Sequence, residues 1–408
     1  MKLAPSLLAV AVLAALSAPA ARAEIAIDQF DFFGGSEVSF EGLIQTDLDE
    51  FHKDVRSLNG SAGDGLTSDA GMRRAELVLK GKGVQFDWVL GYDAKATKFL
   101  DTNVKWKFSA NTGLTIGQFK QPNSLEELSS TKNNDFISKA MVTNTFAVAR
   151  RVGIGFNTGE DNWTATASVF GRELTRNLGE GNGYGGRVTW APIMDADNTL
   201  HVGLSGVDYQ ARDATFPGHG RIQWRTRPDA DLSGTRLIDT GTFTDGNRIR
   251  TIGLEGLWLH GPFKVQAEYM TSDTSRKLHP SFSADSWYVQ GVWNITGEKF
   301  GYKAGVPTTP LPNEPATGMV QLALRYDAMD LNDGSLSPPA TLGGAPIVHG
   351  VLGGKEHNIT AGVNWYWHSN FKFALNYVKV NSDKYSAAAK TFVNDSPNII
   401  EVRAQFYF

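Results

Sequence analysis

The chain has 408 residues, a formal net charge of −4 and no cysteine. The acidic balance argues against a nucleic-acid partner, and without cysteine no disulfide can stabilise the fold. Charged residues make up only 20% of the chain, below the soluble norm of about 25%.

The N-terminus has the features of an export signal. Lys2 precedes an apolar run at residues 7–16, and Ala21-Arg22-Ala23 fits a small-residue cleavage site. We therefore expect residues 1–23 to be a cleaved signal peptide and residues 24–408 to form one domain. The rest of the chain has no run of eighteen apolar residues, which excludes membrane-spanning helices.

Side chains of alternating polarity dominate the remaining sequence. In residues 320–328, for example, Leu322 and Leu324 fall on one face of an extended strand, and Gln321 and Arg325 fall on the other. This period of two predicts sixteen strands, at residues 37–50, 70–80, 84–94, 103–109, 113–120, 147–157, 162–172, 183–191, 198–210, 247–259, 262–273, 285–296, 317–329, 356–367, 370–380 and 399–408.

The connections between these strands differ in length. Several are tight turns, whereas others are long and rich in Gly, Pro or polar residues, at 121–146, 211–246, 300–316 and 330–355. An even number of strands joined alternately by short turns and long loops is typical of a transmembrane barrel. We expect an all-β fold, a sixteen-stranded antiparallel transmembrane β-barrel, with a secreted carbohydrate-binding β-sandwich as the alternative.

The pattern of the last strand predicts which solvent each of its faces contacts. Phe406 and Phe408 alternate with Glu401, Arg403 and Gln405. In a barrel the two phenylalanines face lipid and the polar side chains face a watery lumen.

Seven segments resemble the phosphate-selective porin O and P family of bacterial outer-membrane channels. They are "GMRRAELVLKG", "GLTIGQFKQPNSLEELSSTK", "RRVGIGFNTG", "WRTRPDADLSGTRLIDTG", "LEGLWLHGPFKVQAEYM", "GVNWYWHSNFKFALNYVKV" and the closing "RAQFYF". The resemblance implies a homotrimer of sixteen-stranded barrels in a lipopolysaccharide-containing outer membrane, each narrowed by an inward-folded third loop. It also implies that the terminal Phe408 acts as a signal for the barrel-assembly machinery.

The third long connection contains a helix signal. Ser124 and Glu127 form an S-x-x-E capping box, which predicts a short helix in "SLEELSS". The resemblance favours folding of this loop into the lumen, and an outward surface loop is the alternative.

Basic residues near this loop are the candidates for an anion site, since selectivity is set by charges at the narrowest point of a pore. The resemblance assigns Arg73 and Arg74 and the loop residues Ser130, Thr131 and Lys139 to that site. Arg73 lies out of phase with inward-facing Arg74, so we expect it at a strand end or at a bulge that turns it inward. Other basic candidates near the constriction are Lys120, Lys132, Arg150 and Arg151.

Two features qualify the resemblance. Glu127 stands where phosphate-binding members have a lysine, which opposes strong phosphate selectivity. In the family, a ladder of arginines leads anions into the pore. The arginines of this chain that resemble it are Arg225, Arg227, Arg236, Arg248 and Arg250. Among these, we expect Arg225 and Arg227 to lead anions inward.

The sequence therefore predicts a passive outer-membrane diffusion channel for small anions, with phosphate and polyphosphate as candidate solutes. A general, weakly selective porin and an outer-membrane barrel enzyme or adhesin are the alternatives. No catalytic motif is present, and the histidines form no metal-ligand pattern, so we expect neither a cofactor nor a metal. "GNGYGG" at 181–186 precedes an expected strand, which makes it a turn and not a phosphate-binding loop.

Overall fold

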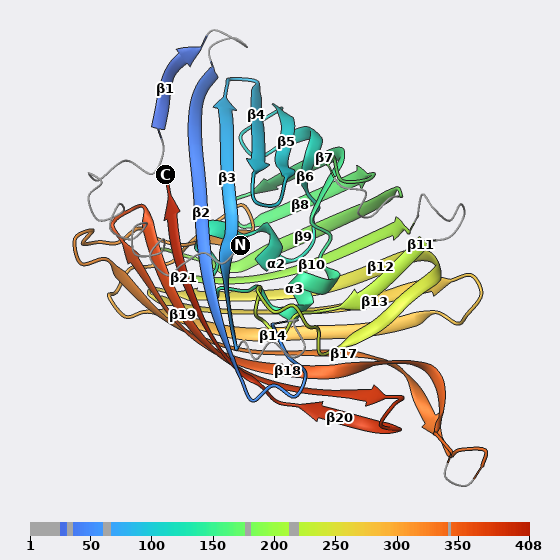
Figure 1. The fold of residues 1–408 in the computed structure, drawn as a ribbon. Helices are drawn as coiled ribbons and strands as arrows, with labels where there is room; N and C mark the ends of the chain where they lie inside the picture. Colours follow the sequence, from blue (N-terminus) through green and yellow to red (C-terminus); the bar gives the residue numbers. More distant parts are fainter. Residues whose placement is uncertain (1–24, 31–35, 60–66, 176–180, 212–219, 342–343) are drawn as a thin grey trace.

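The computed structural model describes residues 25–30, 36–59, 67–175, 181–211, 220–341 and 344–408, and shows one large antiparallel sheet curved into a barrel (Figure 1). Sheet closure is direct, because the first and last barrel strands pair from Leu43 with Tyr407 to His52 with Asn398. The sixteen barrel strands are β2 (Ser36–His52), β3 (Ser68–Lys82), β4 (Phe86–Asp93), β5 (Lys98–Lys107), β6 (Gly113–Lys120), β7 (Arg150–Glu160), β8 (Trp163–Phe170), β9 (Gly183–Met194), β10 (Asn198–Gln210), β12 (Asp239–His260), β13 (Phe263–Arg276), β14 (Phe282–Asn294), β17 (Met319–Ser337), β18 (Ile347–Trp367), β19 (Phe371–Ser386) and β21 (Asn398–Tyr407).

The two faces of the sheet have the polarity expected of a barrel in lipid. On β17, Leu322 and Leu324 are 41% and 58% exposed on the outside, whereas Gln321 and Arg325 are 0% and 1% exposed on the inside. Closing the sheet also pairs the backbone groups that hydrocarbon could not satisfy. The structure thus confirms the predicted barrel and excludes the β-sandwich.

Aromatic side chains gather at the end of the barrel that carries the short turns. Phe263 stacks on Trp293, and Phe406 packs between Phe371 and Phe408. Such a ring of aromatic residues marks the level of a membrane interface in transmembrane barrels.

All sixteen predicted strands correspond to barrel strands, and those at 113–120 and 198–210 have the predicted bounds. At the long-loop end, β12, β17, β18 and β19 extend well beyond the predictions. Three further strands pair with these barrel strands or their extensions: β1 (Ile25–Phe30) with β2, β11 (Gly220–Arg225) with β12, and β20 (Thr391–Asp395) with β19. The expected signal peptide lies outside the described residues.

One of the long connections lies at the end of the barrel that carries the short turns. Residues 295–318 join β14 to β17 among the short turns, where Phe300 N donates to Gly261 O and Lys299 pairs with Asp197. The connection contains a small hairpin, β15 (Gly301–Lys303) and β16 (Val306–Thr308). This hairpin enters the lumen, because Gly305 O accepts a hydrogen bond from the inward-facing Arg187 at 2.7 Å.

The lumen is partly filled by the connection between β6 and β7, residues 121–149, which we call L3. It contains the helices α2 (Leu125–Leu128), η1 (Thr131–Asn133) and α3 (Met141–Phe146). Met141, Val142 and Phe146 of α3 belong to an apolar cluster with inward-facing residues of β12, β13, β14 and β17. L3 therefore lies on that wall of the barrel and leaves a space between itself and parts of the opposite wall, β2 to β7. No helix in the described part of the chain is long and apolar enough to cross a membrane.

Candidate functional site

The first turn of L3 is held by a cap and by a carboxylate of the wall. Ser124 Oγ accepts a hydrogen bond from Glu127 N at 3.2 Å, as the capping-box pattern predicted. The N–H groups of Leu125 and Glu126 both donate to the Glu268 carboxylate of β13 at 2.8 Å. The N–H groups of the first turn have no partner within the helix, so Glu268 fixes where α2 begins.

Further along, L3 is held against β13 and β21 by buried charges. Asp135 accepts a hydrogen bond from Lys264 of β13 at 2.7 Å, and Arg403 of β21 donates to Ile137 O at 2.8 Å. Each of the two cations is at most 5% exposed. Breaking buried pairs of this kind is costly, and the position of L3 is correspondingly well defined.

A second loop segment, residues 226–238, which we call L5, also lies inside the barrel. Its Asp229 pairs with Arg325 of β17 at 3.0 Å, and its Asp231 pairs with Arg73 of β3 at 2.8 Å. Burial opposes the charge on Asp231, but Arg73 and Arg403 outweigh it and lower the pKa of that carboxyl to about 2. L5 thereby bridges two walls of the lumen.

Arg73 lies at a bulge, which is one of the two positions expected for it. Gln45 and Thr46 are neighbours on β2, yet they pair with Arg74 and Met72 on β3, which leaves Arg73 as an extra residue. A β-bulge changes the direction in which a side chain points, so both arginines reach the lumen. Arg73 is then used by the L5 pair and Arg74 by a pair with Glu76 at 2.8 Å.

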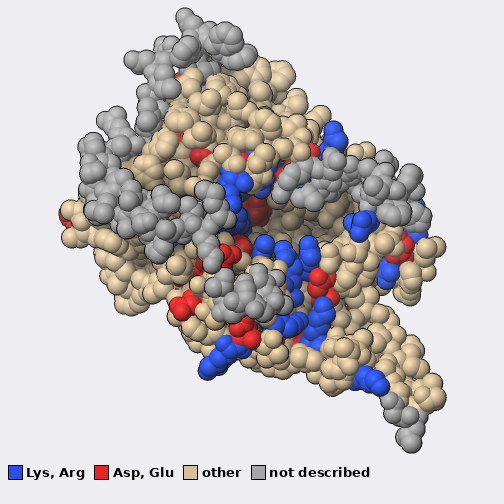
Figure 2. Space-filling view, in the orientation of Figure 1, with Lys and Arg blue, Asp and Glu red and all other residues tan. Residues whose placement is uncertain are grey.

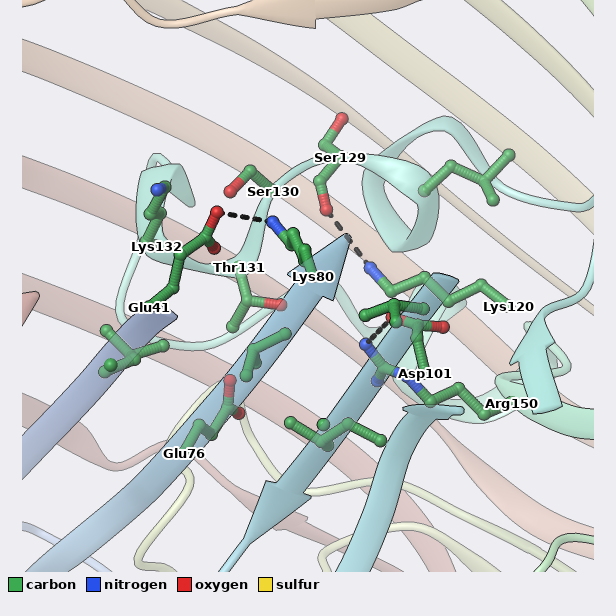
Figure 3. Close-up of a pocket in the computed structure, with 17 residues that line it drawn as sticks. Glu41, Glu76, Lys80, Asp101, Lys120, Ser129, Ser130, Thr131, Lys132 and Arg150 are labelled. Carbon is green, nitrogen blue, oxygen red and sulfur yellow. Dashed lines mark hydrogen bonds and ion pairs between the residues drawn. The ribbon is translucent and has the colours of Figure 1, made fainter. Parts of the chain in front are cut away.

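Between L3 and the opposite wall lies a hollow of about 300 Å³, which we call the charged hollow (Figure 3). It is bounded by strands β2 to β7 on one side and by residues 128–132 of L3 on the other. Its charged lining consists of Lys80, Lys120, Lys132, Arg150, Glu41, Glu76 and Asp101.

Most cations of the charged hollow have carboxylate neighbours. Lys80 pairs with Glu41 at 2.5 Å, and Arg150 pairs with Asp101 at 2.8 Å. Both pairs are partly open to solvent, where such pairs contribute little to stability. They do divide the wall of the hollow into alternating positive and negative groups.

Glu127 binds two of the predicted lysines. Its carboxylate pairs with Lys139, and one of its oxygens lies 3.9 Å from Lys120 Nζ. Lys120 also donates to the carbonyl oxygens of Glu127 and Ser129. Burial opposes the charge on Glu127, but Lys139, Lys120 and Arg150 lower its pKa to about 2. The carboxylate therefore lies between these two lysines and neutralises part of their charge.

The remaining predicted loop residues line the charged hollow. Ser130 and Thr131 present hydroxyl groups to it, and Lys132 lies beside them with its Nζ 5.6 Å from the centre of the Tyr407 ring (Figure 3). Within the described residues, Lys132 has no carboxylate within ion-pairing distance. It is therefore the cation of this hollow that remains most available to a solute.

The arginines expected to lead into the pore divide into two groups. Burial lowers the pKa of Arg236, and Arg227 and Arg225 lower it further, so these three cations lie near one another. Arg248 and Arg250 instead pair with Asp208. The space-filling view shows Lys and Arg side chains around and within a central hollow, with acidic side chains between them (Figure 2).

The partner carboxylates of this site were not among the predicted site residues. Glu76 and Lys80 alternate in phase with Arg74, whose side chain points inward. This alternation was the signal in the sequence that could have placed Glu76 in the site. Glu41 and Asp101 lie on other strands, and only the strand register brings them into the same hollow. Within the described residues, no group of three or more His, Cys, Asp or Glu residues could hold a metal ion.

Solved structures of other outer-membrane proteins share this architecture. Outer-membrane expressed OmpT of Vibrio cholerae aligns with a TM-score of 0.56 at 10% identity, over 94% of this chain and 100% of that one. An anion-selective porin from Comamonas acidovorans aligns with a TM-score of 0.53 at 13% identity, over 91% of this chain and 100% of that one. At these identities the likeness shows the fold.

Sequence comparison gives the family. An uncharacterized protein of Caulobacter vibrioides is 28% identical over 84% of this chain and 68% of its own length. Porin O of Pseudomonas aeruginosa is 29% identical over 48% of this chain and 47% of its own length. The family described as phosphate-selective porin O and P matches residues 44–408. The chain therefore belongs to the phosphate-selective porin O and P family and is an outer-membrane porin, a channel rather than an enzyme.

Proposed function

We propose that the channel passes small anions by passive diffusion with a weak preference over cations. The observation that supports this most directly is the lining of the charged hollow, which has the four cations Lys80, Lys120, Lys132 and Arg150 and the three carboxylates Glu41, Glu76 and Asp101. Charge at the narrowest level of a pore sets its selectivity. A small positive excess favours anions without excluding cations.

Specific binding of phosphate is not part of the proposal. Arginine forks and unpaired lysines are the usual ligands of phosphate, but here Arg73, Arg74 and Arg150 are paired with carboxylates. Glu127 likewise holds Lys120 and Lys139. A phosphate would have to displace these carboxylates, so phosphate and polyphosphate pass, in this proposal, as small anions among others.

The test is the reversal potential of purified protein in a planar bilayer under a KCl gradient. The proposal expects a potential of the sign given by chloride, with a chloride-to-potassium permeability ratio modestly above one. Lys132→Ala should reduce that ratio, because it removes the cation that has no carboxylate partner. A ratio below one in the parent channel would contradict the proposal.

We also propose that the channel is a homotrimer in the outer membrane, exported with residues 1–23 as a cleaved signal. A trimer form is described for OmpT of Vibrio cholerae, which supports the first part. Three equal conductance steps for each insertion event would be the expected record. The surrounding lipopolysaccharide and lipid contact the outward apolar face of the barrel.

Phe408 is proposed as the signal for the barrel-assembly machinery. Its backbone exchanges two hydrogen bonds with Gly42, at 3.1 and 3.2 Å. Its ring lies where a side chain on residue 42 would have to be, since a Cβ there would meet the ring at 2.4 Å. Deleting Phe408 should lower the amount of folded barrel in the outer membrane, and unchanged insertion would contradict this role.

A further inference from the structure

A second hollow lies on the other side of the same stretch of L3. Residues Leu128 to Ser130 border the charged hollow, and they also border a hollow of about 310 Å³ that faces β13 and the hairpin residues Val306–Thr308. β13 belongs to the wall opposite β4, which borders the charged hollow. L3 therefore separates two spaces of similar size, and we call the second one the neutral hollow.

The charged side chains around the neutral hollow already have partners. Lys264 donates to Asp135 at 2.7 Å, and the other oxygen of Asp135 accepts from Gln290 at 2.7 Å. Glu126 accepts a hydrogen bond from Ala140 N at 3.1 Å. An ionic solute entering this space would find neither an unpaired cation nor an unpaired carboxylate among the described residues.

Several neutral polar side chains of this space, in contrast, have no hydrogen-bond partner in the described part of the chain. Among the described residues, no hydrogen-bond partner is found for four side chains that line this hollow alone and are open to solvent. They are two hydroxyl and two carboxamide groups, those of Thr308, Thr309, Asn133 and Asn134. Such groups can each donate and accept hydrogen bonds.

Apolar surface completes the lining. Leu128, Val306 and Pro307 border the same space. A sugar or polyol presents hydroxyl groups at its edges and C–H groups on its faces, so it would satisfy both kinds of surface. The volume is at the lower end of the range of about 300–1,000 Å³ for small-molecule sites, which suits a molecule of monosaccharide size.

We propose that the neutral hollow binds a small uncharged polyhydroxylated molecule, a monosaccharide or a polyol. The site differs from the anion path in position and in chemistry. This proposal requires a water-filled lumen, as in the proposed channel, and it holds whether or not the channel prefers anions.

Saturation-transfer NMR on the detergent-solubilised protein tests the site, with D-glucose and sorbitol as probes. The test variant combines Asn133→Leu with Thr308→Val, which removes one carboxamide and one hydroxyl at nearly constant volume. Loss of the corresponding hydrogen bonds should weaken binding about tenfold. Lys80→Met, which alters only the charged hollow, is the matched control and should bind the probes like the parent.

Two results would overturn the proposal: no saturation transfer to either probe in the parent protein, or equal weakening by Lys80→Met and by the double variant. Thr309→Val gives a second test should the double variant fail to show the heat-modifiable migration of a folded barrel. The reversal potential of each variant is measured in parallel. Sugar binding that is lost while the anion preference remains separates this site from the proposed anion path.

Discussion

At the scale of single residues, the site is defined by pairing rather than by an excess of basic side chains. Five of the predicted cations, Arg73, Arg74, Lys120, Lys139 and Arg150, have carboxylate partners. The alternating pattern was enough to predict that Arg73 must lie at a strand end or at a bulge, because an arginine on the lipid side is costly. It could not predict the partners, since those come from loops and from strands distant in sequence.

Glu127→Gln should increase the preference for anions. The substitution removes the carboxylate that neutralises Lys120 and Lys139 and leaves the cap hydrogen bond of its backbone in place. One additional unpaired charge beside the path corresponds to about 1 kcal/mol, or roughly a fivefold increase in the chloride-to-potassium permeability ratio. The reversal potential under a KCl gradient measures it.

Glu160→Gln is the matched control for this change. Glu160 is an exposed residue at the end of β7, on the side of the short turns. Glu160→Gln removes the same charge at a position away from the charged hollow. The chloride-to-potassium permeability ratio of this variant should stay close to that of the parent. Equal shifts in both variants would mean that Glu127 has no special position.

The charge on Glu127 should also affect how the stability of the fold depends on pH. Its pKa falls from 4.5 to about 2 in the folded protein, so its charge stabilises the fold above about pH 4.5, and this contribution is lost as the pH falls through about 2. The difference in unfolding temperature between parent and Glu127→Gln should hold from pH 7 to about 4.5 and shrink toward pH 2. A difference that vanishes already at pH 5 would show that Glu127 is not held by the lysines.

At the scale of elements, the hairpin of β15 and β16 is the part that the sequence described least well. Residues 300–316 were expected to be a long loop, but three-residue strands are too short for period-two alternation to reveal them. Their position depends on a tertiary contact, because Arg187 donates both to Glu255, at 2.6 Å, and to Gly305 O, at 2.7 Å. The short helix of L3 was predictable by contrast, since its capping box is local.

Arg187→Met should release the hairpin from the lumen. Arg187 and Glu255 are 5% and 2% exposed, and breaking a buried pair costs about 3–5 kcal/mol. We expect a larger single-channel conductance and faster proteolytic cleavage within residues 301–308. Arg248→Met is the control: it breaks the more exposed pair with Asp208 and should change neither the conductance nor the rate of cleavage. An unchanged conductance in Arg187→Met would show that the hairpin does not restrict the path.

At the scale of the whole molecule, the closed barrel of sixteen strands was predicted from alternating side chains together with the even strand count and the alternation of short turns with long loops. Closure follows because hydrocarbon leaves a β-sheet no other way to pair its edges. How the lumen is filled does not follow from these patterns. The inward faces of β12 to β21 are covered by L3 and L5, whereas a space remains between L3 and parts of β2 to β7, and this asymmetry places the charged hollow.

The most direct test of the account compares two neighbouring residues of β3. Val78 lines the charged hollow, whereas Leu77 is 51% exposed on the outer face. The chain contains no cysteine, so Val78→Cys and Leu77→Cys each introduce a single thiol. In the reconstituted channel, a water-soluble thiol reagent should modify the Val78→Cys variant and reduce its current. The reaction should be faster with an anionic than with a cationic reagent. The Leu77→Cys variant should stay unmodified, because the membrane covers that thiol. Modification at 77 with no effect at 78 would contradict the account.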